Sequence, residues 1–217
     1  ALIDAGLEVI ETDLGEYILQ LANEPPSHIV APVVHKTREE VSDLFAEKHH
    51  APRLTDIPAL CREAREKLRP HFLSADMGVS GANFIIAETG STLIVTNEGN
   101  GRMVTTLPKV HVAITGIEKV VPTLEDVTTL LRVLPRHGTG QSITNYISVT
   151  TGPRRPGDLD GPEHFHVILV DAGRTKLIGG DMQEMLRCIR CGACMNHCPV
   201  YQSVGGHAYG WVYPGPM

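Results

Sequence analysis

Four of the five cysteines of this 217-residue chain lie within eleven positions, between Cys188 and Cys198. The run reads C-x2-C-x2-C-x3-C-P, with Cys191 and Cys194 between those two residues. Thiolates at this spacing can converge on one inorganic cluster, and Gly192 gives the backbone the freedom that such a turn requires. A structural zinc site needs two C-x2-C pairs about a dozen or more residues apart, and disulfides are rare in cytosolic proteins. The spacing therefore predicts iron–sulfur ligands.

The number of clusters is left open by the cysteines alone. In ferredoxins with two clusters, the fourth cysteine of each run binds the cluster of the other run. By that rule Cys188, Cys191 and Cys194 bind one cluster and Cys198 a second, although Cys198 could instead complete the first. The remaining thiol, Cys61, falls in a helical pattern, where we expect a half-buried structural cysteine.

The residues upstream predict an α/β domain that carries this segment. Capping signals and apolar periodicity predict helices over 13–22, 37–50, 55–76 and 123–135, the third with Leu60, Ala64 and Leu68 on its buried face. Strands are predicted over 7–12, 28–34, 79–108 (two or three strands), 109–121, 141–152 and 165–173. The runs at 28–34, 109–121 and 165–173 are mostly apolar, which is typical of buried parallel strands.

We therefore predict an α/β three-layer sandwich with a mostly parallel sheet over residues 1–178, and a Cys-rich segment over residues 179–217. The first residues, ALIDAG, resemble the last turn of a helix, and we expect the chain to be a piece of a longer polypeptide.

Charge and hydropathy exclude several classes of partner. The chain has 19 Lys and Arg against 25 Asp and Glu, a formal charge of −6, which argues against nucleic acid or an anionic membrane surface. No apolar run approaches the roughly 20 residues that a membrane span needs, and the N-terminal residues lack the features of a signal peptide. We expect a soluble, cytoplasmic protein.

Four blocks of sequence carry a family resemblance together with the cysteine run: AETGSTLIVTNEGN, GIEKVVPTLED, TGPRRPGDLDGPEHFHVILVDAGR and GGHAYGWVYPGP. With them, the chain resembles the iron–sulfur subunit of the bacterial L-lactate utilisation system over essentially all its residues. The resemblance implies a lactate-utilisation domain, similar in fold to sugar-phosphate isomerases and coenzyme A transferases, followed by a ferredoxin-type segment with two [4Fe–4S] runs. It also implies two companion subunits, an electron acceptor and a role in oxidising L-lactate to pyruvate.

By this resemblance Cys188, Cys191 and Cys194 are ligands of the first cluster and Cys198 is a ligand of the second. The family's second cysteine run is absent here, so we expect clusters in the full-length protein that are absent or incomplete in this chain. Whether the chain is itself an enzyme, rather than a component of an oxidoreductase complex, is left open.

Two turns offer sites other than the cysteines. Glu88, before the turn residues Thr89 and Gly90, could be an acylated nucleophile like the glutamate of coenzyme A transferases, or a strand-end carboxylate bonded to its own turn. The loop at 97–102, with Glu98, Gly99 and Asn100, could hold an anion through its amides, or form a plain hairpin turn.

Histidines and arginines supply further candidates. His164 and His166 could bind a metal, His197 and His207 could tune a cluster through hydrogen bonds, and Arg154 and Arg155 could dock an acidic partner. The rival functions to electron transfer are therefore acyl transfer by Glu88 and a scaffold for companion subunits.

Overall fold

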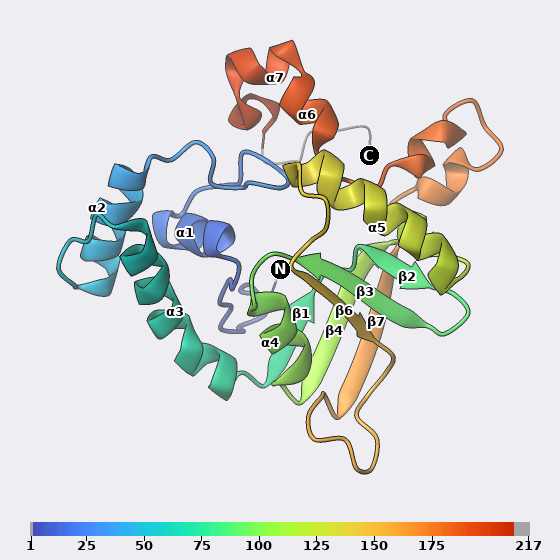
Figure 1. Cartoon of the computed structure of the whole chain (residues 1–217), viewed down its shortest axis with the longest axis horizontal. Helices are drawn as coiled ribbons and strands as arrows, with labels where there is room; N and C mark the ends of the chain where they lie inside the picture. The colour runs from blue at the N-terminus through green and yellow to red at the C-terminus, as the bar shows by residue number, and fades with distance from the viewer. Residues whose placement is uncertain (1, 211–217) are drawn as a thin grey trace. The chain divides into compact units, whose positions relative to one another are not determined.

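The computed structural model describes residues 2–210, which form two compact units (Figure 1). One unit combines residues 2–71 with residues 195–210, and the other comprises residues 72–194. The cysteine run is divided between them. The boundary expected near residue 178 stays a prediction.

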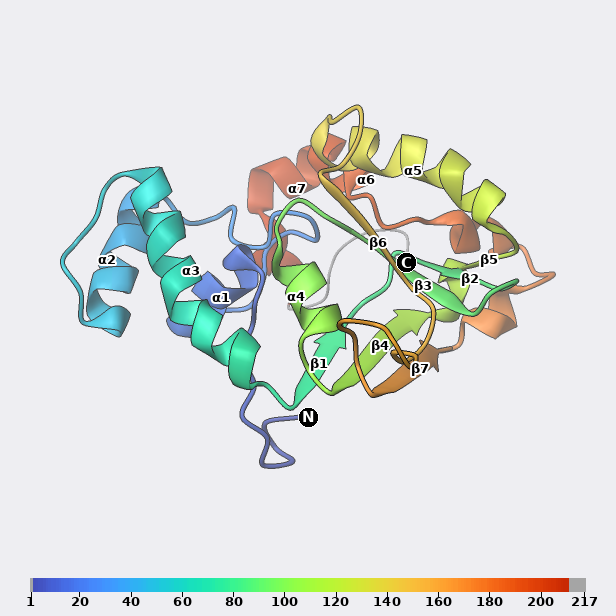
Figure 2. The same ribbon diagram turned by 60° about the horizontal axis from the view of Figure 1, so that its bottom comes forward.

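The unit of residues 72–194 contains two sheets. The first has the order β1-β4-β7 and is parallel throughout; its strands are β1 (Met77–Ser80), β4 (Val110–Gly116) and β7 (His164–Val170). The second has the order β5-β2-β3-β6, with β5 (Val120–Val121), β2 (Phe84–Ile86), β3 (Ser91–Thr96) and β6 (Tyr146–Thr150). Pairs β2–β5, β1–β4 and β4–β7 are parallel, whereas β2–β3 and β3–β6 are antiparallel. The predicted α/β class with mostly parallel pairing is confirmed, and Figure 2 shows the parallel strands side by side.

Helix α5 (Leu124–Thr139) covers the second sheet. Thr123 and Asp126 form a capping box at its start, and Gly140 ends it in the left-handed region at φ 75°. Val127 and Leu134 are buried in a core with Phe84, Ile86 and Leu93. The predicted end at Pro135 is wrong by four residues; Pro135 is buried within the helix, where the tertiary packing outweighs its helix-breaking tendency.

Helix α4 (Asn100–Thr106) packs along β1. A Cβ on Gly78 of β1 would lie 2.1 Å from the Val104 carbonyl oxygen, so only glycine permits this approach. The loop predicted over 97–102 is therefore corrected: Gly99 is the N-cap of a helix, and Asn100 is its first residue.

The other unit begins with α1 (Leu14–Ala22), α2 (Arg38–His49) and α3 (Ile57–Ser74), the last of which extends just past the unit boundary. The predicted face of α3 is confirmed, since Leu60, Ala64 and Leu68 are buried. Cys61 is exposed rather than half-buried, because it lies one position off that face. The C-terminal part consists of α6 (Ala193–His197), which crosses the unit boundary, α7 (Pro199–Val204) and a 3-10 turn, η4 (Gly206–Tyr209).

Three strand predictions are corrected. Residues 7–12 and 28–34 are irregular. In the second stretch the ring Nδ1 of His28 accepts from the amides of Val30 and Ala31, so the backbone is satisfied locally instead of by a sheet. The run at 165–173 does form β7, at the edge of its sheet, but most of its residues are exposed, so the prediction of a buried strand is wrong there. No helix within residues 2–210 is both long and apolar enough to cross a membrane.

Candidate iron–sulfur site

All four cysteines of the run are free thiols. Cys188, Cys191 and Cys198 are half-buried, and Cys194 is exposed. The first three belong to the unit of residues 72–194, whereas Cys198 belongs to the other unit. Over residues 2–210 no three His, Cys, Asp or Glu side chains are gathered as metal ligands. The donor set itself fits an iron–sulfur group, since it offers unpaired soft thiols in a run without a disulfide.

The first part of the run turns sharply and is fixed to the core of its unit. Arg190 and Gly192 have φ of 56° and 77°, so the chain changes direction twice between Cys188 and Cys194. Ile189 and Cys191 pack against the core beneath α5. Gly138 of α5 permits this approach, because a Cβ there would lie 3.3 Å from the Cys191 carbonyl oxygen.

A group of charged side chains lies next to Cys188, and we call it the charge cluster: Glu118, Lys119, Arg174 and Arg190. The Glu118 side chain is 1% exposed, and its Oε2 lies 2.7 Å from Arg174 Nε, although that N–H does not point at the oxygen. Arg190 Nε lies 3.9 Å from Glu118 Oε1. Lys119 is 5% exposed, and its Nζ donates to the Cys188 carbonyl at 3.4 Å.

The fold explains why these groups meet. Glu118 and Lys119 follow the carboxyl end of β4 in the 3-10 turn η1 (Ile117–Lys119), and Arg174 follows the carboxyl end of β7 in η2 (Arg174–Leu177). Because β4 and β7 are parallel neighbours, both turns lie at the same edge of the sheet, where α/β proteins commonly place functional groups. Gly116 leaves room for the carboxylate, since a Cβ there would lie 2.0 Å from Glu118 Oε2.

Burial determines the electrostatics of Lys119. Desolvation lowers the pKa of its ammonium, and the nearby Glu118 carboxylate opposes that effect. Three cations thus surround a single carboxylate, which leaves the charge cluster with an excess of positive charge.

Cys198 begins helix α7 in the other unit. It is the N-cap residue, and its Sγ accepts from the Tyr201 amide at 3.5 Å, while Pro199 occupies the first turn. The Tyr201 hydroxyl donates to the Ser27 carbonyl at 2.6 Å. Burial raises the pKa of the Tyr201 phenol, which keeps this donor protonated.

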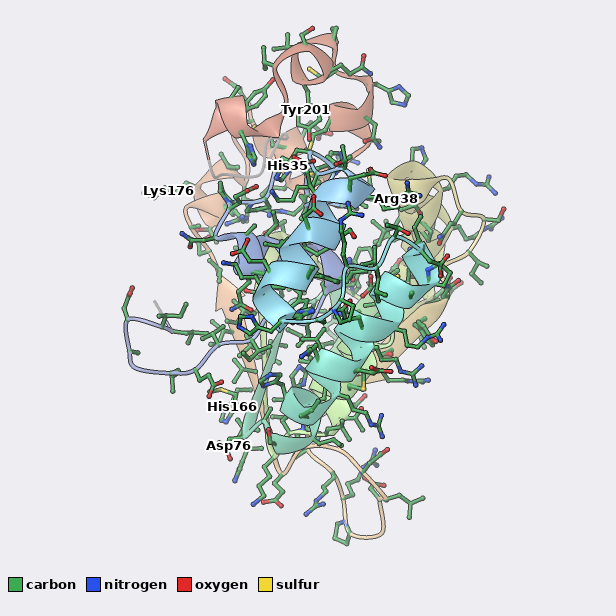
Figure 3. The ribbon with its side chains drawn as sticks, turned by 90° about the vertical axis from the view of Figure 1, so that its left-hand side faces the viewer. His35, Arg38, Asp76, His166, Lys176 and Tyr201 are labelled. Carbon is green, nitrogen blue, oxygen red and sulfur yellow. The ribbon has the colours of Figure 1, made fainter. Side chains whose placement is uncertain are left out.

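The loop of residues 25–35, which we call the docking loop, holds the segment around α7. His28 Nε2 bonds Asn196 Oδ1 at 2.9 Å; because its Nδ1 accepts two amides, Nε2 carries the proton. His207 Nε2 donates to the Pro25 carbonyl at 2.9 Å, and its ring packs on His35 with centroids 4.4 Å apart. Figure 3 labels His35 and Tyr201 at this contact.

The two candidate turns lie at opposite ends of β3. Glu88 is exposed, and its Oε1 accepts from the Leu124 amide at the start of α5 at 2.8 Å, which is the contact of a helix-capping carboxylate. Thr89 and Gly90 form the turn before β3, and the Thr89 hydroxyl bonds Ser91 at 2.7 Å. Glu98, Gly99 and Asn100 follow β3, so the structure does not combine the two sets into one site.

The remaining candidates are histidines and arginines. His164 and His166 are exposed on β7, and Arg154 pairs with Glu163 at 3.0 Å. The amide of Arg155 donates to Asp158 Oδ2. His207 bonds backbone and not sulfur, as described above. The roles predicted for these residues and for His197 stay predictions.

Two regions of the chain match known protein families. Residues 3–170 match the LUD domain family, and residues 184–216 match the 4Fe-4S dicluster domain. The chain belongs to the LUD domain family. Its cysteine run falls within the iron–sulfur match, so the C-terminal segment is of the dicluster type, and [4Fe–4S] clusters are its expected cofactors.

Curated relatives match nearly the whole chain. "Lactate utilization protein B" of Shouchella clausii (strain KSM-K16) is 53% identical over 100% of this chain and 46% of its own length. "Uncharacterized electron transport protein YkgF" of Escherichia coli (strain K12) is 50% identical over 99% of this chain and 45% of its own length. The chain thus spans about half the length of these relatives. A crystal structure of a DUF162 family protein from Deinococcus radiodurans is 20% identical, with a TM-score of 0.36, over 46% of this chain and 57% of that chain.

Sequence reasoning missed the charge cluster and the docking loop. Glu118, Lys119 and Arg174 stand in GIEK and DAGR without a recognisable motif, and Arg190 lies within the cysteine run. The usable signal was the position of DAGR at the end of the strand predicted over 165–173, because polar residues of a parallel sheet come together at strand ends. GIEK fell inside the strand predicted over 109–121, so its place at a strand end was not predicted.

Proposed function

We propose that this chain is part of an iron–sulfur electron-transfer component of a system that oxidises L-lactate to pyruvate. Cys188, Cys191 and Cys194 hold a first [4Fe–4S] centre with a further ligand, and Cys198 is a ligand of a second. The observation that carries the proposal is the run of free thiols inside the segment that matches the dicluster domain. The names of the relatives support the lactate and electron-transport parts.

The chemistry assigns separate tasks to the group and to the protein. When bound, an iron–sulfur group supplies one-electron redox chemistry. The thiolates bind it, the core contacts of Ile189 and Cys191 fix the turn that presents them, and the docking loop fixes the helix that Cys198 begins. Oxidation of lactate releases an electron pair and two protons, so a companion subunit must carry the dehydrogenating centre and a partner must accept the electrons. The companion subunits and the cytoplasmic location stay predictions.

The test is substitution of the thiols in the native gene product that carries this sequence, purified without oxygen. We expect the wild type to be brown, to contain iron and acid-labile sulfide, and to give a paramagnetic signal after reduction. Cys191→Ser should lower the iron and sulfide content and abolish lactate oxidation by the assembled system. Cys61→Ser, at an exposed thiol outside the run, is the matched control and should change neither.

A colourless wild-type protein, or Cys191→Ser protein with undiminished lactate oxidation, would contradict the proposal. Acyl transfer by Glu88 predicts a different outcome, namely a trapped thioester at Glu88 and activity that survives loss of the cysteines. The contact of Glu88 with α5 gives that carboxylate a structural task and does not favour this alternative.

A further inference from the structure

The charge cluster contains three basic side chains but a single carboxylate to pair with them. The ionisable side chains that act on the Lys119 ammonium are those of Glu118, Cys188, Arg190 and Arg174. Among these side chains Glu118 is the one carboxylate, and Arg174 already lies against it at 2.7 Å. Lys119 therefore contributes a buried charge that no carboxylate of its own neutralises.

Burying such a charge opposes folding unless something compensates it. An ammonium taken out of water loses favourable solvation free energy. The hydrogen bond from Nζ to the Cys188 carbonyl is long at 3.4 Å and reaches an uncharged acceptor, so it compensates little. An apolar side chain would fill this position without that cost, which indicates that the charge itself has a use.

The position of Lys119 suggests what that use is. Its Nζ contacts the backbone of the first cysteine of the run, in an environment largely closed to water. Thiolate ligands make an iron–sulfur group anionic, and reduction adds a further negative charge. Net charge and hydrogen bonding around such a group determine its reduction potential, and the effect of a charge is larger where water does not screen it.

We propose that Lys119, which donates to the Cys188 carbonyl, raises the reduction potential of the iron–sulfur centre bound by Cys188, Cys191 and Cys194. The inference rests on the proposed function, since it concerns the same cysteines. Lys119 and Arg174 act as positioning charges: they stabilise the additional electron without binding the metal. Glu118 has the opposite effect on the potential, because it removes part of the positive field while it holds the arginines in place.

The test is a redox titration of the native gene product, assembled anaerobically and followed by its paramagnetic signal. Lys119→Met should shift the midpoint potential of one centre to a more negative value, and Lys119→Arg should restore most of the wild-type value. Glu118→Gln should shift the same centre to a more positive value. Lys109→Met removes a lysine that is exposed in the same unit, and it should leave the potential unchanged.

Iron and sulfide contents, measured on each variant, distinguish a changed reduction potential from incomplete assembly of the iron–sulfur centre. Arg174→Gln removes one positive charge from a side chain that is 14% exposed, and it provides a second test with the same negative shift as Lys119→Met. Unchanged potentials in Lys119→Met and Arg174→Gln, at wild-type iron content, would overturn the inference. Shifts of the same sign in Lys119→Met and Glu118→Gln would also overturn it, because they would indicate loosened structure instead of charge. A wild-type protein without a paramagnetic signal would instead refute the proposed function.

Discussion

Gly206 is the position where a single methyl group should separate the segment around α7 from the docking loop. A Cβ at this residue would lie 1.6 Å from the Ser27 carbonyl oxygen, 2.5 Å from its carbon and 2.9 Å from the Ser27 Cα. All three atoms belong to the backbone, so no side-chain rotation can relieve the overlap. Gly206→Ala must therefore move one backbone away from the other.

The cost follows from the contacts that this movement disturbs. The Ser27 carbonyl accepts from the Tyr201 hydroxyl at 2.6 Å, and the Pro25 carbonyl accepts from His207 at 2.9 Å. Overpacking typically costs about 1–3 kcal/mol, and a partly exposed hydrogen bond contributes about 0.5–1 kcal/mol. We expect Gly206→Ala to weaken docking of this segment by about 3 kcal/mol, on the order of a hundredfold in its opening equilibrium.

Hydrogen exchange measured peptide by peptide is the appropriate assay. Amides of residues 198–205 should lose protection in Gly206→Ala, whereas amides of α5 should keep it. Gly99→Ala is the matched control, because a Cβ at Gly99 meets nothing within 4 Å and its φ is −78°. Wild-type protection of residues 198–205 in Gly206→Ala would refute the argument that this contact holds α7 in place.

Three further substitutions test the burial and capping assignments. Burial raises the pKa of Glu16 from 4.5 to about 8, so between these values the folded state holds a proton that the unfolded chain has lost. The free energy of unfolding should therefore fall as pH rises from 5 to 8. In urea titrations at these two pH values, Glu16→Gln should reduce that fall by about 1–2 kcal/mol, after allowance for partial exposure. Val127→Ala, at a fully buried position of α5, should lower the free energy of unfolding by about 2 kcal/mol. Val133 is 37% exposed on the same helix, so the control Val133→Ala should lower it by less than about 0.5 kcal/mol. Equal losses in the two variants would contradict the placement of the core. Glu88→Ala should cost about 1 kcal/mol through the lost bond to the Leu124 amide, and lost activity at wild-type stability would favour Glu88 as a nucleophile.

The parts of the fold that the sequence predicted are those with local signals. The capping box at Thr123 and the face formed by Leu60, Ala64 and Leu68 depend on residues three or four positions apart, and both are confirmed. The cysteine run is equally local, and the family match places it in a dicluster segment.

The strand predicted at 28–34 failed because its apolar composition is compatible with more than one backbone conformation. Its residues turn around the His28 ring, and that ring bonds Asn196 in a segment about 170 residues further along the chain. A run of this length without alternation cannot distinguish a buried strand from a loop that is covered by another part of the protein. The partner, not the run itself, determines the conformation.

The charge cluster also depends on long-range contacts, but a general rule about the ends of parallel strands applies to it once the strand order is known. GIEK and DAGR meet because β4 and β7 are parallel neighbours, and Lys119 reaches Cys188 across 69 positions. The sequence alone placed DAGR at the end of a predicted strand and GIEK inside another, and neither stretch indicates that the two strands are neighbours. Once the strand order is known, polar residues that follow neighbouring parallel strands can be expected at the same edge of the sheet, where they can form one site. The motif thus identifies the kind of redox group, whereas the residues that we propose to set its potential are determined by the topology of the neighbouring sheet.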